Sequence, residues 1–268
     1  MMEAQPAVKS RSAFKIDVRF VGGLSRTQEN AFRRAADRWS SVIVGDIPSV
    51  VIDGEEIDDI LIIAEGRSID AAEGVLGQSG PTLLRPKAAG AYAFLPAKGE
   101  MTFDSDDLEE LERDGSLVDV IAHEMGHVLG IGTIWARKRL LVGATSSNPT
   151  FHGKHAKGEY GKLRATAPKP VPVENIGGPG TRNSHWRESI FANELMSGYV
   201  TTAGNPLSAL TVASLADLGY SVDMSRAEPY QLPELLSLAD AERRLPAPSA
   251  RRQVLPRIPT VLPDEALV

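Results

Sequence analysis

The segment H-E-M-G-H at residues 123–127 is the feature that most constrains how this chain can fold. It lies in an apolar stretch with helical periodicity, and the breadth of its hydrophobic surface predicts a buried helix. Residues four apart lie on one face of an α-helix, so His123 and His127 present their imidazoles one turn apart. A buried helix that carries two histidines and a glutamate needs a reason, because buried polar groups are costly unless they are paired or bind a metal.

This spacing allows both imidazoles to reach one zinc ion, with Glu124 between them as a general base. The alternative is a surface helix with two unrelated histidines. The flanking residues favour the metal site, since residues 114–116 form a break with an N-cap, and Gly130 and Gly132 predict a C-terminal stop. The pattern is typical of zinc-dependent peptidases.

A catalytic zinc site needs a third protein ligand and one open position. In the short pattern of metzincin peptidases, the third histidine follows the second by six residues, and here Thr133 occupies that position. The remaining histidines are His152, His155 and His185. Spacing alone does not select among them.

Two later motifs bear on that choice. S-H-W-R-E at residues 184–188 contains His185, and N-E-L-M-S-G-Y at residues 193–199 places Met196 where metzincins have a methionine turn below the metal. Together with H-E-M-G-H-V-L-G-I-G-T-I-W, these motifs resemble the leishmanolysin-like metallopeptidases, in which an insertion delays the third histidine. The resemblance covers residues 14 to about 224.

The resemblance implies one catalytic zinc ion held by His123, His127 and His185, with Glu124 as the catalytic base and Met196 beneath the site. It implies an α+β fold, the metzincin-like zincin fold, with a twisted mixed sheet, packed helices, an active-site helix and a C-terminal subdomain that contains the methionine turn. The expected activity is that of a metalloendopeptidase, which hydrolyses peptide bonds through a zinc-bound water that the glutamate activates. The alternatives are a zinc-binding structural protein with weak activity and a zinc hydrolase of a non-peptide amide or ester.

For several residues near these motifs, the sequence allows both a functional and a structural role. His152 and His155 form an H-x-x-H pair that would bind a second metal or lie in an exposed loop. Met196 would also suit an ordinary core position, and Tyr199 would either stabilise an oxyanion or serve the structure.

The acidic run between residues 104 and 110 also keeps two interpretations. It suggests either calcium binding or a short helix capped by Asp104 or Ser105. If the run forms a helix, the remaining carboxylates would interact favourably with the positive N-terminal end of the helix dipole or face solvent.

The composition excludes several classes of protein. A net charge of −6 without a basic stripe argues against nucleic acid as a ligand, so a protein or peptide substrate is expected. The chain has no cysteine, which excludes disulfides and thiolate metal sites. In this respect the chain resembles a bacterial-type, minimal member of the family. Residues 1–12 lack the apolar core of a signal peptide, and no apolar run spans a membrane. A soluble protein is expected, either cytoplasmic or exported by another route, with no indication of its oligomeric state.

The periodicity predicts an alternation of strands and helices before residue 130. Ser25 and Gln28 form a predicted capping box for a helix that ends near residues 45–48. Residues 66–80 are expected to be irregular, and residues 91–95 are expected to form the edge strand with which a substrate pairs. The predicted strands are residues 14–20, 49–52, 59–64, 91–95 and 101–103.

The chain is expected to have three parts. Residues 1–13 are predicted to be disordered, residues 14–228 to form the catalytic domain, and residues 229–268 to form a proline- and arginine-rich tail. Within the domain, residues 136–184 show little periodicity and are predicted to be the insertion, and residues 208–218 are predicted to be a helix that ends at Gly219. In the tail, a short helix is expected near residues 234–244, and the rest is expected to be extended along the domain or disordered.

Overall fold

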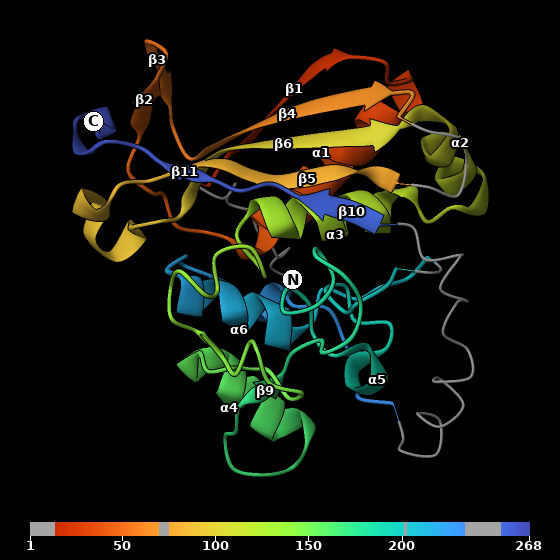
Figure 1. The fold of residues 1–268 in the computed structure, drawn as a ribbon, viewed down its shortest axis with the longest axis vertical. Coiled ribbons are helices and arrows are strands. Elements are labelled where there is room, and N and C mark those ends of the chain that lie inside the picture. Colours follow the sequence, from red (N-terminus) through yellow and green to blue (C-terminus); the bar gives the residue numbers. More distant parts are fainter. Residues whose placement is uncertain (1–13, 70–74, 201–202, 234–252) are drawn as a thin grey trace, which may run out of the picture.

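The computed structural model describes residues 14–69, 75–200, 203–233 and 253–268. A mixed sheet forms its upper half (Figure 1), with the strand order β1-β4-β6-β5-β10 and with β11 also paired to β5. Strands β1, β4 and β6 are parallel to one another, β5 is antiparallel to β6, and β10 and β11 are parallel to β5. The strands are β1 (Ile16–Gly22), β4 (Ile60–Arg67), β5 (Val75–Leu84), β6 (Pro96–Asp104), β10 (Gln253–Pro256) and β11 (Thr260–Val261). The expectation of an α+β fold with a mixed sheet is confirmed.

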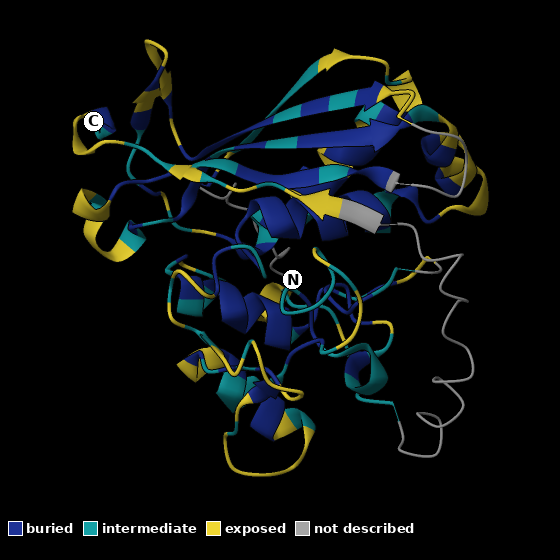
Figure 2. Cartoon of the chain, in the orientation of Figure 1, coloured by how far each residue is buried: buried dark blue, intermediate teal, exposed yellow. Residues whose placement is uncertain are grey.

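Alternation along β4 shows why this sheet has two apolar faces. Ile60 and Ile62 point into the main hydrophobic core, whereas Leu61 and Ile63 contact a smaller cluster on the opposite face. The hairpin of β2 (Val50–Ile52) and β3 (Glu55–Ile57) contributes to that smaller cluster. Figure 2 shows that the central strands and α3 are mostly buried.

Two long helices, α1 (Arg26–Val42) and α3 (Leu117–Val128), pack against each other and against the sheet. The predicted capping box is confirmed, because Ser25 and Gln28 exchange hydrogen bonds at the start of α1. Trp39 of α1 donates its indole N–H to the carbonyl oxygen of Ala122 in α3 at 2.8 Å. This bond joins the two helices one residue before the H-E-x-x-H motif.

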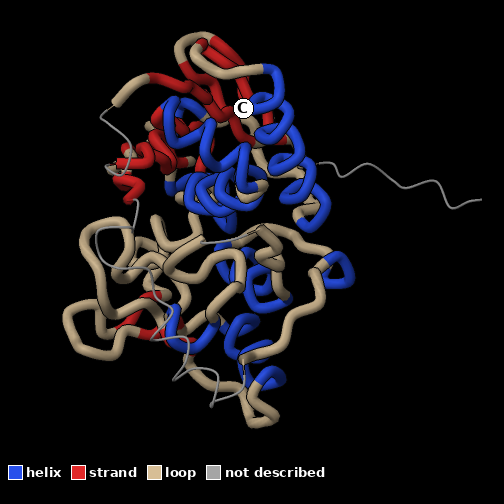
Figure 3. Tube along the Cα trace, turned by 90° about the vertical axis from the view of Figure 1, so that its right-hand side faces the viewer, coloured by secondary structure: helices blue, strands red, loops and turns tan. Residues whose placement is uncertain are grey.

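The lower half of the molecule is rich in loops and short helices (Figures 1 and 3). The predicted helix at residues 208–218 is confirmed as α6 (Ala209–Leu218), with Ser208 as N-cap and Gly219 in the left-handed conformation at the C-cap. The other elements of this half are α4 (Lys154–Leu163), α5 (Glu188–Phe191), β7 (Leu141–Val142), β8 (Thr150–Phe151), β9 (Val171–Pro172) and the 3₁₀ helix η2 (Met224–Arg226).

The predicted insertion, residues 136–184, contains more regular structure than its weak periodicity indicated. It holds the three-stranded sheet β7-β8-β9 and helix α4, which packs against α6. Its strands have two residues each, too few for alternation to emerge in the sequence. Stacked and tilted aromatic rings of Trp135, Phe151 and Trp186 fill the space between this segment and the rest of the core.

Two predicted segments are wrong. Residues 91–95 do not form an edge strand, because the 3₁₀ helix η1 (Lys87–Tyr92) covers their first part and Phe94 has a φ of 68°. Backbone bonds between Arg85 and the pair Phe94 and Leu95 close this segment into a loop. Residues 66–80 are not irregular throughout, since Gly66 and Arg67 end β4 and residues 75–80 belong to β5, and of the described residues in this range only Ser68 and Ile69 lack regular structure.

The acidic run at residues 104–110 is explained by a helix. Asp104 caps α2 (Ser105–Asp114) and accepts a hydrogen bond from the backbone N–H of Asp106 at 2.9 Å. This confirms the predicted capping role. The acidic residues that follow lie in the first turns of α2, where their negative charge interacts favourably with the helix dipole.

The C-terminal residues return to the main sheet. Residues 253–268 contain β10, β11 and the 3₁₀ helix η4 (Asp264–Ala266), and they extend along the outer edge of β5. The expected disorder of residues 1–13 and the expected helix at residues 234–244 lie outside the described residues. Within the part of the chain that the structure describes, no helix has both the length and the apolar character that a membrane span requires.

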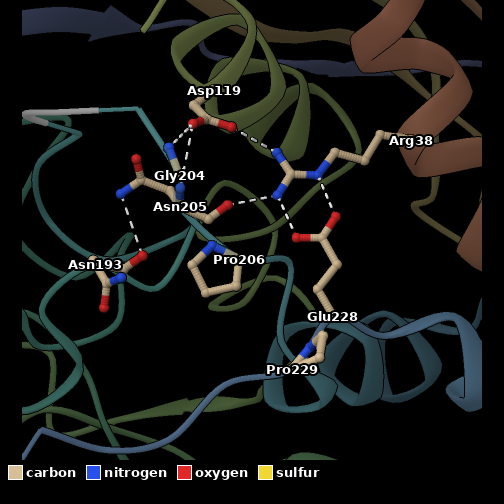
Figure 4. A pocket seen from close by; sticks show the side chains of 8 residues that line it. All are labelled: Arg38, Asp119, Asn193, Gly204, Asn205, Pro206, Glu228 and Pro229. Atoms are coloured by element: carbon tan, nitrogen blue, oxygen red, sulfur yellow. Dashed lines mark hydrogen bonds and ion pairs between the residues drawn. The ribbon is translucent and has the colours of Figure 1, made fainter.

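An ion-pair cluster around Arg38 joins the two halves (Figure 4). The guanidinium of Arg38 in α1 contacts Asp119 at the start of α3 at 2.9 Å and Glu228 after α6 at 2.6 Å, and it donates to the carbonyl oxygen of Asn205. These residues line an open pocket. The charged groups that line the pocket are paired with one another. We therefore interpret this cluster as a structural contact between the upper and lower halves of the molecule.

Candidate active site

Helix α3 places His123 and His127 on one face, as their spacing predicts. The ring Nδ1 of His123 lies 2.6 Å from the carbonyl oxygen of Leu195, and that of His127 lies 2.9 Å from the carbonyl oxygen of Ile131. A carbonyl oxygen only accepts hydrogen bonds, so each Nδ1 carries the proton and donates. Each Nε2 is therefore an unprotonated nitrogen with a free lone pair.

His185 approaches the same point from the loop before α5. Its Nε2 lies 3.0 Å from that of His123 and 2.9 Å from that of His127, although 62 and 58 residues separate them in the chain. Its Nδ1 lies 2.9 Å from the carbonyl oxygen of Thr181, which assigns the ring the same tautomer. The structure therefore brings together the three histidines named from the sequence.

The turn after α3 makes room for this approach. Gly132 has a φ of 76°, and a Cβ on it would lie 2.1 Å from the carbonyl oxygen of Ser184. A glycine is required there, since any side chain would push away the segment that carries His185.

Three lone pairs that converge without a proton repel one another unless a cation lies among them. The three Nε2 atoms are 2.9–3.2 Å apart, and no hydrogen bond can form between them when every Nδ1 is the protonated nitrogen. Neutral imidazoles whose second nitrogen donates to a backbone carbonyl are the usual ligands of zinc in proteins. The donor set thus fits zinc.

Burial keeps these imidazoles neutral. The three rings have exposed fractions of 5–7%. Desolvation lowers the pKa of His123 to about 3, with a further contribution from His127, and lowers the pKa of His127 to about 4. The pKa of His185 is also lowered well below its ordinary value, mainly by desolvation. Neutral rings near pH 7 are the protonation state that metal binding needs.

Glu124 faces a serine from the neighbouring strand. It is buried, and burial raises the pKa of its carboxyl group to about 7, while a hydrogen bond from Ser79 acts in the opposite direction. The hydroxyl of Ser79 in β5 donates to Oε2 of Glu124. This contact is absent from the sequence-based predictions, because β5 was expected to be irregular and 45 residues separate the two partners.

Met196 lies beneath the histidine pair. It has no exposed surface, and a Cβ on Gly126 would lie 2.6 Å from its sulfur atom. Gly126 stands between the two histidines of α3, so its missing side chain lets the methionine pack directly against the helix. The methionine turn that the family resemblance implies for Met196 stays a prediction.

A buried glutamate ties the Met196 turn to the rest of the lower half. Glu194 accepts hydrogen bonds from the backbone N–H of Met196 at 2.6 Å and from the hydroxyl of Thr211 in α6 at 2.5 Å. The same hydroxyl accepts the indole N–H of Trp186 at 2.8 Å. This network links the turn, α6 and the residue after His185, and sequence analysis named none of its polar members as a site residue.

The remaining residues singled out from the sequence lie outside the histidine cluster. Thr133 donates its hydroxyl to the carbonyl oxygen of His127 and thereby caps α3. His152 contacts the hydroxyl of Thr150 at 3.0 Å, and His155 is exposed in the first turn of α4. Among the described residues, neither belongs to a group of three or more metal-binding side chains. Tyr199 donates its backbone N–H to Glu188, and its part in oxyanion stabilisation stays a prediction.

The family of the chain follows from a comparison with protein-family models. The peptidase M8 model, leishmanolysin, matches residues 94–238, which is more than half of the chain. The match includes α3, the segment of His185 and the Met196 turn. A search of curated proteins found no match. The chain belongs to the leishmanolysin family of metallopeptidases.

Proposed function

We propose that this protein is a zinc-dependent endopeptidase with a metzincin-like fold. The convergence of three unprotonated Nε2 atoms within 3.2 Å of one another, beside a buried glutamate, carries the proposal. In this proposal, His123, His127 and His185 hold one zinc ion, and Met196 provides the methionine turn beneath it. The catalytic domain spans residues 14–228, with residues 136–184 as its insertion and residues 229–268 as its tail.

Zinc, when bound, supplies a Lewis acid that lowers the pKa of water and polarises a carbonyl group. Glu124 is the only carboxylate in H-E-x-x-H, and as a base it accepts the proton of the attacking water and passes it to the leaving amine. Burial raises the pKa of its carboxyl group, which favours the uptake of a proton by this group. The carbonyls of Leu195, Ile131 and Thr181 keep the imidazoles oriented through their Nδ1 atoms.

Ser79 is the positioning residue of Glu124 in this mechanism. Its hydroxyl holds one carboxylate oxygen, which leaves the other to face the reacting water. We expect Ser79→Ala to lower kcat about 10-fold with little change in KM, because a hydrogen bond to a charged group contributes about 1.5 kcal/mol. Steady-state kinetics and zinc content are the measurements.

Two matched variants interpret that result. Ser79→Thr keeps the hydroxyl and is expected to restore most of kcat. Ser41→Ala removes a serine hydroxyl that donates to the carbonyl oxygen of Arg38 within α1, far along the chain from Glu124, and it is expected to behave as wild type. If Ser79→Ala loses zinc or fails to fold, Ser79 has a structural role and does not merely position Glu124.

The proposed activity is tested by digestion of a mixed peptide library with the purified protein. We expect internal cleavage of peptides, its loss after treatment with a chelator, and its return on addition of zinc. Zinc binding without cleavage of the library or of amide and ester substrates would indicate a structural zinc protein. Cleavage confined to non-peptide amides or esters would assign the site to a different hydrolase class.

A further inference from the structure

The C-terminal strand β10 occupies the edge of the sheet nearest the candidate active site. Its residues Val254, Leu255 and Pro256 pair with Gly77, Gln78 and Ser79 of β5. Figure 1 shows β10 running along the outer side of β5, the strand that contacts α3. Strand β5 would otherwise end the sheet here and present unpaired backbone groups.

An ion pair next to this strand reaches across β5. Arg257 follows β10, and its guanidinium lies 2.8 Å from the carboxylate of Glu100 in β6. Gly80 lies between them, since it pairs with Glu100 and a Cβ on it would lie 3.3 Å from the backbone nitrogen of Arg257. The missing side chain at Gly80 leaves the space in which Arg257 crosses from the tail to β6.

The edge that β10 covers is continuous with the candidate site. Ser79 pairs with Pro256 and also holds Glu124 through its hydroxyl. A polypeptide that pairs with β5 at Ser79 would therefore lie next to the base, which is the arrangement that β-strand addition of a substrate requires. The tail and such a substrate would compete for the same backbone groups.

Several features make β10 a weakly held strand of the main sheet. It has four residues, a register shift after Gln253 and a parallel pairing, which is less stable per residue than the antiparallel β5-β6 ladder. Pro256 lacks the N–H that a ladder uses. Leu255 is 40% exposed and Ile258 is 95% exposed, so these two side chains bury little apolar surface.

We infer that β10 is an intramolecular competitor, which must leave the edge of β5 before an extended polypeptide substrate can pair there. This inference rests on the proposed function. The end of the chain can stay attached during the exchange, because residues after β11 make separate contacts. Leu262 donates to Leu84, and Val268 donates to Ser49. Displacement of β10 is therefore a local opening.

A disulfide between β10 and β5 tests the competition, since the chain has no cysteine of its own. Gln78 and Leu255 are paired, and strand alternation directs the Gln78 side chain to the face opposite Ser79. We expect the double variant Gln78→Cys/Leu255→Cys to cleave fluorescein-labelled casein at least about 10-fold more slowly when oxidised than when reduced. The two single-cysteine variants should show no such difference. Equal rates in the oxidised and reduced double variant, with the disulfide verified by mass, would overturn the inference.

The ion pair offers a test in the opposite direction. Arg257→Glu places two carboxylates next to each other across Gly80, and we expect it to raise kcat/KM for casein about 3- to 10-fold through a lower KM. Glu100→Arg should act similarly. The exchange Arg257→Glu/Glu100→Arg restores an ion pair and should return KM toward wild type. Single variants with the wild-type KM would count against displacement of β10.

A binding measurement separates this inference from the proposed function. The disulfide pair is combined with Glu124→Gln, and the affinity for labelled casein is followed by fluorescence anisotropy. Tighter binding in the reduced form supports the competition even if no form of the protein cleaves casein, an outcome that would refute only the peptidase proposal. Equal affinity in both forms, or binding in neither, would refute the competition.

Discussion

Glu124→Gln is expected to lower kcat/KM for peptide hydrolysis by about 10²- to 10⁴-fold, the range that a general acid–base contributes. The amide has nearly the shape of the carboxylate, and its oxygen can still accept the Ser79 hydroxyl, but it cannot take a proton from water. Zinc content should stay at the wild-type value, because the three imidazoles form the proposed ligand set.

Glu112→Gln is the matched control for that variant. Glu112 is an exposed carboxylate in α2, so the same chemical change there should leave both kinetics and zinc content unaltered. Full activity of Glu124→Gln would remove Glu124 from the mechanism. Loss of zinc together with activity would instead make Glu124 part of the metal-binding unit.

His185→Ala is expected to abolish stoichiometric zinc binding in protein purified without added metal. The variant loses one of three converging nitrogens. Removal of a residue that only hydrogen-bonds to a metal ligand already weakens metal affinity by about 10- to 100-fold, so removal of a ligand should weaken it more. The affinity for zinc should therefore fall by more than about 100-fold. Mass spectrometry of the metal content and competition with a chromogenic chelator measure the two quantities.

The two histidines outside the cluster, His152 and His155, serve as controls for that experiment. His152→Ala and His155→Ala remove imidazoles that lie outside the cluster, so about one zinc ion per chain is expected in each. Zinc retained in full by His185→Ala would mean that His152, His155 or a carboxylate completes the site. The proposed ligand set would then be wrong.

Local patterns predicted the elements that local interactions determine. The helical periodicity around residues 123–127 located α3 and its buried face, and capping patterns located the starts of α1 and α2. The segment at residues 91–95 shows where such patterns fail. Its apolar residues resemble a strand, but the backbone of Arg85 bonds Phe94 and Leu95 and closes the segment into a loop. The side chain of Arg85 is fully buried and donates to backbone carbonyls before β2, before β4 and at the start of β6, so tertiary contacts override the local preference.

The prediction for the segment that forms β5 was wrong for the opposite reason. Its glycines, serine and proline resemble a loop, and Gly77 is required because a Cβ there would lie 2.2 Å from the carbonyl oxygen of Thr102. Pairing on both sides, with β6 and β10, holds this segment extended despite its composition. The partners lie far away in the chain, so no local window contains the signal.

The sequence by itself determined that this protein has a buried helix with two histidines on one face and a glutamate between them, because residues four apart on a helix lie one turn apart whatever surrounds them. Its motifs also named His185 and Met196, through resemblance to a family. Only the tertiary structure decided that the third imidazole reaches the first two, that Ser79 holds Glu124, and that the tail covers the edge of β5. Each of these contacts joins residues dozens of positions apart, so no local pattern in the sequence contains it.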